Sequence, residues 1–412
     1  MLLATRRIPA LADELLTRYR SVRAKSLALA APLSEEDQCV QSMPDASPTK
    51  WHLGHTTWFF EAIVLQAHVP GYQVFDARLA YLFNSYYEAL GARHPRPQRG
   101  LLTRPPLALV HTYRRHVDAA IARFLQSDDS AQQADALALL ELGLNHEQQH
   151  QELLLTDILH LLSCSPLLPA YGDLPKMAFP PDAGPVQWRP VDGGISQLGA
   201  DDELAGFCFD NETPRHARLV APFQIAHRPV SCADYLNFVQ DGGYCNPLLW
   251  LSDGWAQVQS QGWVAPLYWL APDDPRCPAP HWQVFGLNGV QALNPADAVS
   301  NVSFYEAMAY AEWTGARLPT EFEWELALGV AGVCNMLGTV WQWTRSAYEP
   351  YPGFKPRNGA VREYNGKFMV GQQVLRGASL ATPPGHSRGT YRNFFPPAAR
   401  WQFSGLRLAR DA

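Results

Sequence analysis

The chain has 412 residues, of which 47% are hydrophobic and 17% charged, and its formal net charge is −6. This length exceeds one ordinary domain, so two domains with a sizeable core are expected. The acidic balance argues against a nucleic-acid-binding surface, and no apolar run approaches the roughly 20 residues of a membrane span.

The seven cysteines are scattered along the chain without any C-x-x-C spacing. An odd, dispersed set favours reduced thiols over a disulfide framework. Residues 1–7 are not followed by an apolar segment of signal-peptide length. We therefore expect a cytoplasmic protein.

Residues 1–164 are predicted to form a helical domain with four long helices, at 10–29, from Ser47-Pro48 to about 65, at 106–125 and at 135–162. Serine before proline is typical of a helix start, with Ser47 as N-cap and Pro48 in the first turn. Four helices of this length predict a four-helix bundle. The connection at 69–105 is long and rich in tyrosine and arginine, and such loops usually carry function.

Residues 165–190 contain seven prolines and are predicted to be an extended linker. Beyond it, short apolar runs alternate with turns rich in glycine, tryptophan and aspartate, and one clear helix is expected at 303–314. The prediction is an α+β protein with a bundle at 1–164, a linker at 165–190 and an irregular α+β domain at 191–412.

The segment His146-Glu-Gln-Gln-His150 lies within an apolar stripe. Two histidines four residues apart on a helix point the same way and can bind one metal ion. A neutral imidazole on an apolar stripe needs a partner, because an unpaired buried polar group costs a few kcal/mol (roughly 2–7). A metal is the simplest partner for both, and the alternative is a pair of core histidines bonded to other side chains.

Catalytic metals usually have three protein ligands and an open position. His55 is the best third candidate, because it lies with Trp51 and Trp58 on the stripe of its own predicted helix. His52 is one residue off that stripe and is expected behind the ligands or at the surface. Three neutral histidines suit Fe(II) or Zn(II), and the sequence does not choose between them.

His-Glu-x-x-His is also the zinc-peptidase signature, in which Glu147 would be the general base. That pattern expects a further ligand downstream on a following segment. His160 comes ten residues later without the expected spacing, so the peptidase interpretation is disfavoured.

Residues 42–66 and the His146–His150 motif resemble the DinB-like bundle of the ergothioneine-type sulfoxide synthases. The second half is similar to the domain of formylglycine-generating enzyme, a C-type-lectin-like fold of the sulfatase-modifying type. The matching pieces are Arg317–Trp324, Gly338–Thr344, Leu375–Ser379 and Ser404–Ala409. The resemblance covers nearly the whole chain, and the order of the two domains is more specific than any single motif.

The resemblance implies a non-haem Fe(II) enzyme that uses O2 to join a chalcogen donor to C2 of the imidazole of hercynine, the trimethylated betaine of histidine. The three iron ligands of the family fall on His55, His146 and His150. Its hercynine-contacting glutamine falls on Gln149.

The family's asparagine–aromatic pair near the C-terminus falls on Asn393-Phe394, followed here by Phe395. An aromatic face beside a quaternary ammonium is favourable through a cation–π interaction. We name all three residues as candidates for substrate binding, with ordinary core packing as the alternative for the two phenylalanines.

In one branch of the family a tyrosine pair lies near the iron, and here it falls on Tyr86-Tyr87. A phenol can lose a proton and an electron together, which suits this chemistry. Both tyrosines are candidates, Tyr87 being favoured, and packing within the loop is the alternative.

The branch that uses γ-glutamylcysteine has an acid where this chain has Phe395, which disfavours that donor. Free cysteine would need a carboxylate clamp, and the candidates are Arg93, Arg96, Arg99 and Arg104. For each arginine taken alone, a place in a solvated basic loop is the favoured interpretation over a role as a ligand. The related selenoneine synthases use a selenosugar donor that needs no such clamp, and this prediction is slightly favoured over the sulfur donors.

Three other functions are weighed against this one. Formylglycine-generating enzyme itself needs a copper-binding cysteine pair near its C-terminus, and no cysteine follows Cys334. A metal-dependent thiol transferase would fit the bundle without O2 but would not explain the second half. A carbohydrate- or partner-binding protein would leave the two-histidine stripe without a purpose.

Overall fold

The computed structural model describes residues 8–127, 130–172, 184–201 and 206–412. The chain divides into two compact units. Unit 1 comprises Met1–Cys164, Asp202–Phe207 and Pro356–Tyr364, and unit 2 comprises Ser165–Asp201, Cys208–Lys355 and Asn365–Ala412. The long helices lie in unit 1, whereas unit 2 combines strands with shorter helices, so the expected α+β class is confirmed. Residues 173–183 of the proline-rich segment lie outside the described residues, and strand β1 begins at Trp188, inside the range expected to be linker.

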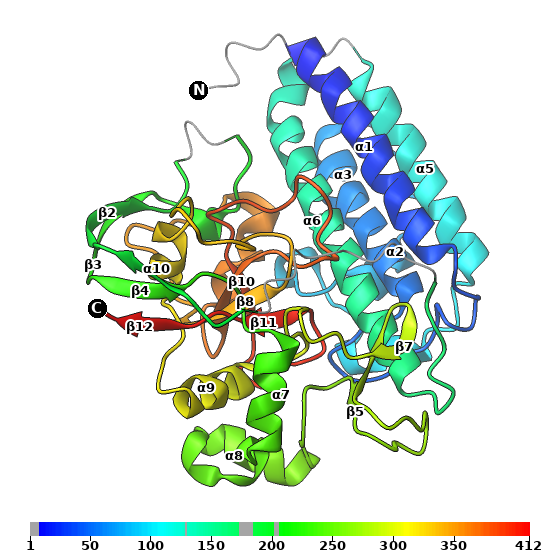
Figure 1. Cartoon of the computed structure of the whole chain (residues 1–412). Coiled ribbons are helices and arrows are strands. Elements are labelled where there is room, and N and C mark those ends of the chain that lie inside the picture. The colour runs from blue at the N-terminus through cyan, green and yellow to red at the C-terminus, as the bar shows by residue number, and fades with distance from the viewer. Residues whose placement is uncertain (1–7, 128–129, 173–183, 202–205) are drawn as a thin grey trace. The chain divides into compact units, whose positions relative to one another are not determined.

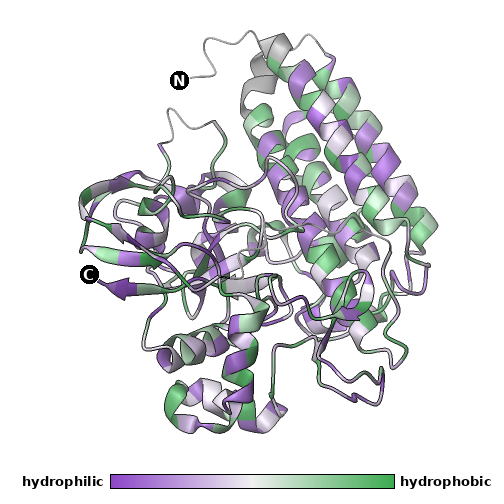
Figure 2. Ribbon diagram, in the orientation of Figure 1, coloured by the Kyte–Doolittle hydropathy of each residue, from purple (hydrophilic) through white to green (hydrophobic). Residues whose placement is uncertain are grey.

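Unit 1 is built on long helices that pack side by side (Figure 1). Its helices are α1 (Ile8–Ala30), α2 (Thr49–Phe59), α3 (Gln66–His68), α4 (Arg78–Phe83), α5 (Leu107–Leu125) and α6 (Ser130–Ser163). α1 packs against α6 and α5, and α2 packs against α5 and α6. The helices carry both apolar and polar residues along their length (Figure 2), as expected for helices that bury one face in a bundle.

The helix expected from Ser47 to about residue 65 differs from the prediction at both ends. Pro48, not Ser47, is the N-cap of α2, and its extended backbone makes no side-chain cap. Ser47 is used otherwise, because its hydroxyl accepts a hydrogen bond from Arg99 Nη1 at 2.9 Å. Beyond Phe59 the helix continues as a π-helix at Phe60–Leu65, a rare feature that is frequent near functional sites.

The long connection at 69–105 has structure of its own. It contains α4 and two 3₁₀ turns, η3 (Glu88–Leu90) and η4 (Arg96–Leu101). Gly54 allows α4 to lie close to α2, because a Cβ at Gly54 would stand 2.3 Å from the Phe83 ring. The loop is thereby held against the helix that carries His52 and His55.

The described residues of unit 2 form four small sheets and four α-helices. The sheets have the strand orders β1-β4-β12, β10-β9-β8-β11, β2-β3 and β5-β6-β7. The strands are β1 (Trp188–Val191), β2 (Gly194–Leu198), β3 (His216–Val220), β4 (Phe223–Ala226), β5 (Trp269–Leu270), β6 (Gln283–Gly286), β7 (Gly289–Ala292), β8 (Trp341–Ala347), β9 (Gln373–Gly377), β10 (Asn393–Phe395), β11 (Ser404–Leu406) and β12 (Ala409–Asp411). The helices are α7 (Cys232–Gln240), α8 (Ser252–Gln261), α9 (Phe304–Trp313) and α10 (Glu321–Leu326).

Side-chain caps start three of these helices. Ser231, Ser303 and Thr320 each accept a hydrogen bond from the backbone of the third helical residue, and an acid at that position bonds back to the cap. The helix predicted at 303–314 is therefore confirmed as α9, with Ser303 as its cap.

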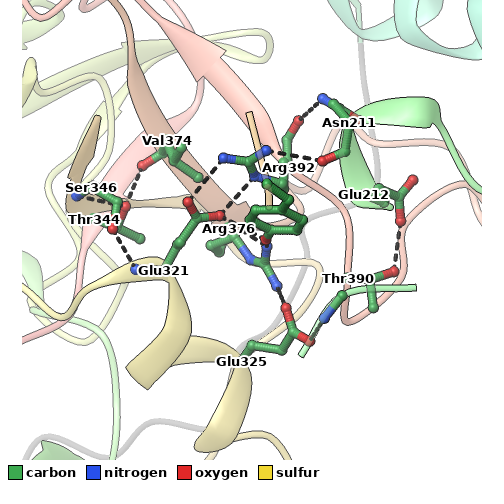
Figure 3. A network of polar contacts seen from close by, with 12 residues as sticks. Asn211, Glu212, Glu321, Glu325, Thr344, Ser346, Val374, Arg376, Thr390 and Arg392 are labelled. Atoms are coloured by element: carbon green, nitrogen blue, oxygen red, sulfur yellow. Dashed lines mark hydrogen bonds and ion pairs between the residues drawn. The ribbon is translucent and has the colours of Figure 1, made fainter. Parts of the chain in front are cut away.

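A buried ionic network joins α10 to the β10-β9-β8-β11 sheet of unit 2 (Figure 3). Glu321 accepts hydrogen bonds from Arg392 at 2.8 and 2.9 Å, while Arg376 pairs with Glu325. All four side chains are almost fully removed from solvent. Because losing one partner would leave a buried charge uncompensated, these four residues stabilise the fold of unit 2.

No helix in the described ranges is both long and apolar enough to cross a membrane. All seven cysteines are free thiols.

Candidate metal centre

His55, His146 and His150 converge within unit 1. One ring nitrogen from each lies within 4.8 Å of the others. The three ring centroids are 4.6 to 4.9 Å apart, and His55 Nε2 is 3.2 Å from His146 Nε2. α2 supplies the first histidine and α6 the other two, as the two apolar stripes predicted.

The three imidazoles are held neutral, as metal ligands must be. Burial lowers the pKa of His146 to about 3, in spite of the opposing effect of Glu147. Burial also lowers the pKa of His55 and His150 well below the usual value, and the neighbouring histidines lower it further. In addition, His146 Nδ1 is buried without a hydrogen-bond partner in the described residues. A buried cluster of neutral imidazole nitrogens fits a metal ion.

His55 is oriented by the last residue of α4. Its Nδ1–H donates to the carbonyl oxygen of Phe83 at 2.6 Å, which leaves Nε2 as the lone pair available to a metal. Trp51 stacks on one side of the His55 ring at 4.6 Å, and Trp58 is stacked 5.6 Å away. The ring can therefore neither flip nor swing without breaking these contacts.

His52 lies behind the ligands. Its Nδ1 is 2.8 Å from His150 Nδ1, and its Nε2 is 3.0 Å from Asp157 Oδ2. Asp157 also accepts the backbone N–H of Ser47 at 2.8 Å. Asp157 follows His150 by seven residues, two helical turns on the same face of α6. This spacing is a sequence signal that Asp157 lies near His150, and it could have revealed the carboxylate behind the ligands.

Glu147 is not placed to act as a peptidase base. It is bonded to Arg23 Nη1 at 3.0 Å, to Arg114 Nη2 at 2.9 Å and to Ser26 Oγ at 2.6 Å. Burial alone would raise the pKa of Glu147, but the two arginines outweigh it and bring the pKa to about 2. A carboxylate that is fully buried and held by two cations is a structural ion-pair partner, and this removes the main support for the peptidase interpretation.

Tyr86 and Tyr87 lie in the same unit as the three histidines. Their rings stack on each other at 4.7 Å, and Tyr87 lies 5.6 Å from Trp58, which itself stacks on His55. Tyr87 is fully buried, and its hydroxyl makes no well-formed hydrogen bond with the described residues. Burial raises the pKa of Tyr87 well above its usual value, and Tyr86 and Tyr364 add to the effect.

Gln149 is held by a residue from far along the chain. Tyr364 donates a hydrogen bond to Gln149 Oε1, and its ring lies edge-on to His146 at 5.6 Å. The neighbouring Glu363 accepts the backbone N–H groups of Glu88 and Ala89. The segment at 356–364 thus brings a phenol to the histidine cluster, and because it lies 215 residues from Gln149, no local pattern could have revealed it.

The three residues expected near the C-terminus form β10 of unit 2. Phe394 stacks on Tyr348 at 4.1 Å, and Phe395 packs edge-on against Trp401 at 5.7 Å. Asn393 Oδ1 accepts the backbone N–H of Phe394. All three side chains are partly exposed, so they remain accessible in addition to packing within the unit.

The loop arginines differ from one another. Arg93 pairs with Glu88 at 2.8 Å, Arg96 donates to the carbonyl oxygen of Asp45, and Arg104 is exposed. Arg99 is buried with its guanidinium 3.4 Å above the Trp51 ring.

Comparison with known proteins covers both units. The DinB superfamily model matches residues 18–154, and the Sulfatase-modifying factor enzyme 1-like domain matches residues 187–332 and 329–412. Hercynine oxygenase of Mycolicibacterium smegmatis is 32% identical over 97% of this chain and 98% of its own length. Hercynine oxygenase of Mycobacterium tuberculosis is 31% identical over 97% of this chain and 99% of its own length. Ergothioneine biosynthesis protein 1 of Schizosaccharomyces pombe is 26% identical over 51% of this chain and 28% of its own length.

Both domain models fall in the predicted order, and the similarity to the mycobacterial relatives extends over nearly the full length of each chain. The chain belongs to the ergothioneine-type sulfoxide synthase family of oxygen-dependent oxidoreductases.

Proposed function

We propose that this protein binds Fe(II) on His55, His146 and His150 and uses O2 to join a chalcogen donor to C2 of the hercynine imidazole. The observation that carries the proposal is the convergence of three neutral histidines in a chain that is similar over nearly its full length to hercynine oxygenases. Three histidines leave coordination positions for other ligands, and iron held there supplies the redox chemistry.

The protein's own side chains bind the substrate and handle the proton. Gln149, placed one residue before His150 and fixed by Tyr364, offers its amide to hercynine beside the metal. The raised pKa of Tyr87 keeps its phenol protonated, so a proton is available at Tyr87 Oη for the reaction. Tyr86, stacked on Tyr87, is the second candidate for this role.

Asn393, Phe394 and Phe395 are proposed to contact hercynine. Aromatic faces attract a quaternary ammonium because its charge interacts with the ring quadrupole, a contribution of about 0.5–2 kcal/mol. The stack on Tyr348 keeps the Phe394 ring in a fixed orientation. Little side-chain conformational entropy is therefore lost when this ring contacts the substrate.

For the donor, we propose a selenosugar, which would make this protein a selenoneine synthase. Phe395 packs against Trp401 where an acid would be needed for the ammonium group of γ-glutamylcysteine. Of the proposed clamps for a donor carboxylate, Arg93 and Arg96 already have partners in the protein. A neutral sugar needs neither kind of anchor.

One observation favours a second candidate, a hercynine sulfoxide synthase that uses cysteine. Arg99 is buried, its Nη1 donates to Ser47 Oγ, and its Nε has no hydrogen-bond partner among the described residues. Burial, together with the neighbouring Arg96 and Arg93, lowers the pKa of Arg99 to about 8. A donor carboxylate would stabilise this guanidinium, with Arg104 as an exposed second contact.

Oxygen uptake by the anaerobically Fe(II)-reconstituted protein tests the proposal. Hercynine is supplied with a seleno-N-acetylglucosamine, with cysteine or with γ-glutamylcysteine, and mass spectrometry identifies the product. Uptake with the selenosugar and a selenium-containing product supports the selenoneine synthase. Uptake with cysteine and a sulfoxide product establishes the second candidate, and metal-dependent thiol transfer without any uptake would replace both.

A further inference from the structure

His52 forms a short chain of hydrogen bonds with a metal-facing histidine at one end and a carboxylate at the other. The two ring nitrogens of His52 contact His150 Nδ1 at 2.8 Å and Asp157 Oδ2 at 3.0 Å. His52 and Asp157 are both buried, with side-chain exposures of 4% and 7%. Two contacts of this length in a buried setting fix the plane of the His52 ring.

The chemistry of the end group determines where the protons lie. A carboxylate only accepts hydrogen bonds, so the Nε2 of His52 carries the proton that Asp157 receives. The Nδ1 of a neutral His52 is then an acceptor and receives the Nδ1–H of His150. His150 is left with its lone pair on Nε2, the nitrogen that remains to bind a metal.

We propose that His52 and Asp157 are positioning residues for the metal centre, which hold His150 in the ring orientation and the tautomer that present Nε2 to the metal. The inference rests on the proposed function, because it concerns the same three-histidine centre. It adds two residues to that centre, and neither is a ligand. His55 is held in a similar way, because its Nδ1–H donates to the Phe83 carbonyl oxygen. In two of the three candidate ligands, a hydrogen bond at Nδ1 therefore fixes the tautomer that leaves Nε2 for the metal.

Asp157 also connects the metal centre to the start of α2. The same Oδ2 that accepts from His52 accepts the backbone N–H of Ser47, one residue before the cap of the helix that carries His55. α6 therefore aligns its own ligand and the other ligand helix through one carboxylate oxygen. For this reason Asp157 is a poor site for a test variant, and His52 is the better one.

The test compares the Co(II) affinity of the full-length protein with that of three variants. His52→Leu removes both hydrogen bonds at similar volume, while His52→Gln keeps one donor and one acceptor. His160→Leu is the matched control, since His160 lies on α6, the helix of His150 and Asp157, and bonds Ser42 instead of the cluster. Affinity is measured from the visible absorption of bound Co(II) against a competing chelator.

We expect His52→Leu to weaken Co(II) binding about 10- to 100-fold, the effect typical of losing an outer hydrogen bond to a metal-bound histidine. His52→Gln is expected to restore most of the affinity, and His160→Leu to leave it unchanged. Wild-type affinity in His52→Leu would overturn the proposal. X-ray absorption that shows one nitrogen fewer around Co(II) in His52→Leu would also overturn it, because His52 would then be a ligand.

A measurement on the wild-type protein keeps the test valid if His52→Leu fails to fold. Nitrogen-15 spectra of the histidine side chains, recorded with Zn(II) bound, report which nitrogen of each ring carries a proton. The proposal predicts a proton on Nε2 of His52 and on Nδ1 of His150, and a proton on Nδ1 of His52 would overturn it. Failure of the wild-type protein to bind any of these metals would instead remove the proposed metal centre itself.

Discussion

At the scale of the residue, the adjacent residues His146 and Glu147 have different roles, one as a candidate metal ligand and the other as an ion-pair partner. His146 is a neutral ring beside the other two histidines, whereas Glu147 is a charge compensated by Arg23 and Arg114. Successive residues on a helix point in different directions, so adjacent side chains contact different neighbours in the bundle. The motif therefore combines a candidate metal site with a stabilising ion pair.

Replacement of the buried carboxylate by an amide tests the structural role. Glu147→Gln leaves Arg23 and Arg114 in the bundle core with less compensating charge, and we expect a loss of about 3–5 kcal/mol in the free energy of unfolding. Urea denaturation of the metal-free protein measures it, with Glu36→Gln at an exposed position as control. A fully stable but inactive Glu147→Gln would contradict this account and revive a catalytic role.

The buried histidines make the metal-free protein sensitive to acid. The pKa of His146 is lowered to about 3 in the fold, whereas an unfolded histidine titrates near 6.5. Below about pH 6.5 the unfolded chain therefore binds more protons than the native one, and stability falls by up to about 1.4 kcal/mol per pH unit for each such histidine until its folded pKa is reached. Thermal unfolding from pH 7.5 to 4 should show this decline, and His146→Gln should make it less steep, because His55 and His150 still contribute. A melting temperature independent of pH in this range would argue against buried neutral histidines.

A contact in the site could be predicted from the sequence only where the two contacting residues lie on one helix or on a recognisable apolar stripe. His146 and His150 follow from their spacing of four, and His55 from its apolar stripe. The contacts of His52 with Asp157 could have been found from the helical spacing of Asp157 to His150. Tyr364 could not, because a contact made 215 positions along the chain leaves no local periodicity.

At the scale of the element, close packing of α2 and α4 supports the ligand geometry. Gly54 precedes His55, and the ring it faces belongs to Phe83, the residue whose carbonyl orients His55. Loss of this contact would affect the ligand without touching its side chain.

A methyl group at Gly54 should therefore weaken the metal centre. Gly54→Ala places a Cβ 2.3 Å from the Phe83 ring, so α4 has to move and the Phe83 carbonyl with it. We expect a loss of stability of about 1–3 kcal/mol, as is usual for overpacking, and a lower Co(II) affinity. Gly286→Ala, where a Cβ meets no described atom within 4 Å, is the control. Unchanged Co(II) affinity in Gly54→Ala would contradict the coupling of α4 to His55.

The long helices were predictable because an amphipathic period of 3.6 residues is a local property. α1, α5, α6 and α9 lie where the pattern placed them, within a few residues. The π-helix at Phe60–Leu65 and the shift of the α2 cap to Pro48 were not predicted, since both depend on tertiary partners. The strands of unit 2 are two to seven residues long, too short for an alternating pattern to stand out from loops.

At the scale of the whole molecule, both units contain buried ion pairs, Glu147 with Arg114 in unit 1 and Glu321 with Arg392 in unit 2. Unit 1 has a candidate metal centre in addition. Metal binding should therefore stabilise unit 1 in particular, because only the folded bundle brings the three histidines together.

Calorimetry with and without metal tests this. At a free Co(II) concentration 100 times its dissociation constant, binding stabilises the folded state by about 2.7 kcal/mol. The unfolding transition of the helical unit 1, identified by its loss of helical circular dichroism, should therefore move to higher temperature. A chelator should reverse the shift, and His55→Ala should show none. A shift of equal size in His55→Ala would place the metal elsewhere.

The most direct test of the account is oxygen consumption by the Fe(II)-reconstituted protein and its His55→Ala variant, each with hercynine and the donor that gives product. We predict that the wild-type protein binds one iron and consumes O2 only when hercynine is present. His55→Ala should lose stoichiometric iron and oxygen uptake together. Hercynine-dependent uptake retained by His55→Ala would contradict the three-histidine centre on which the proposed function rests.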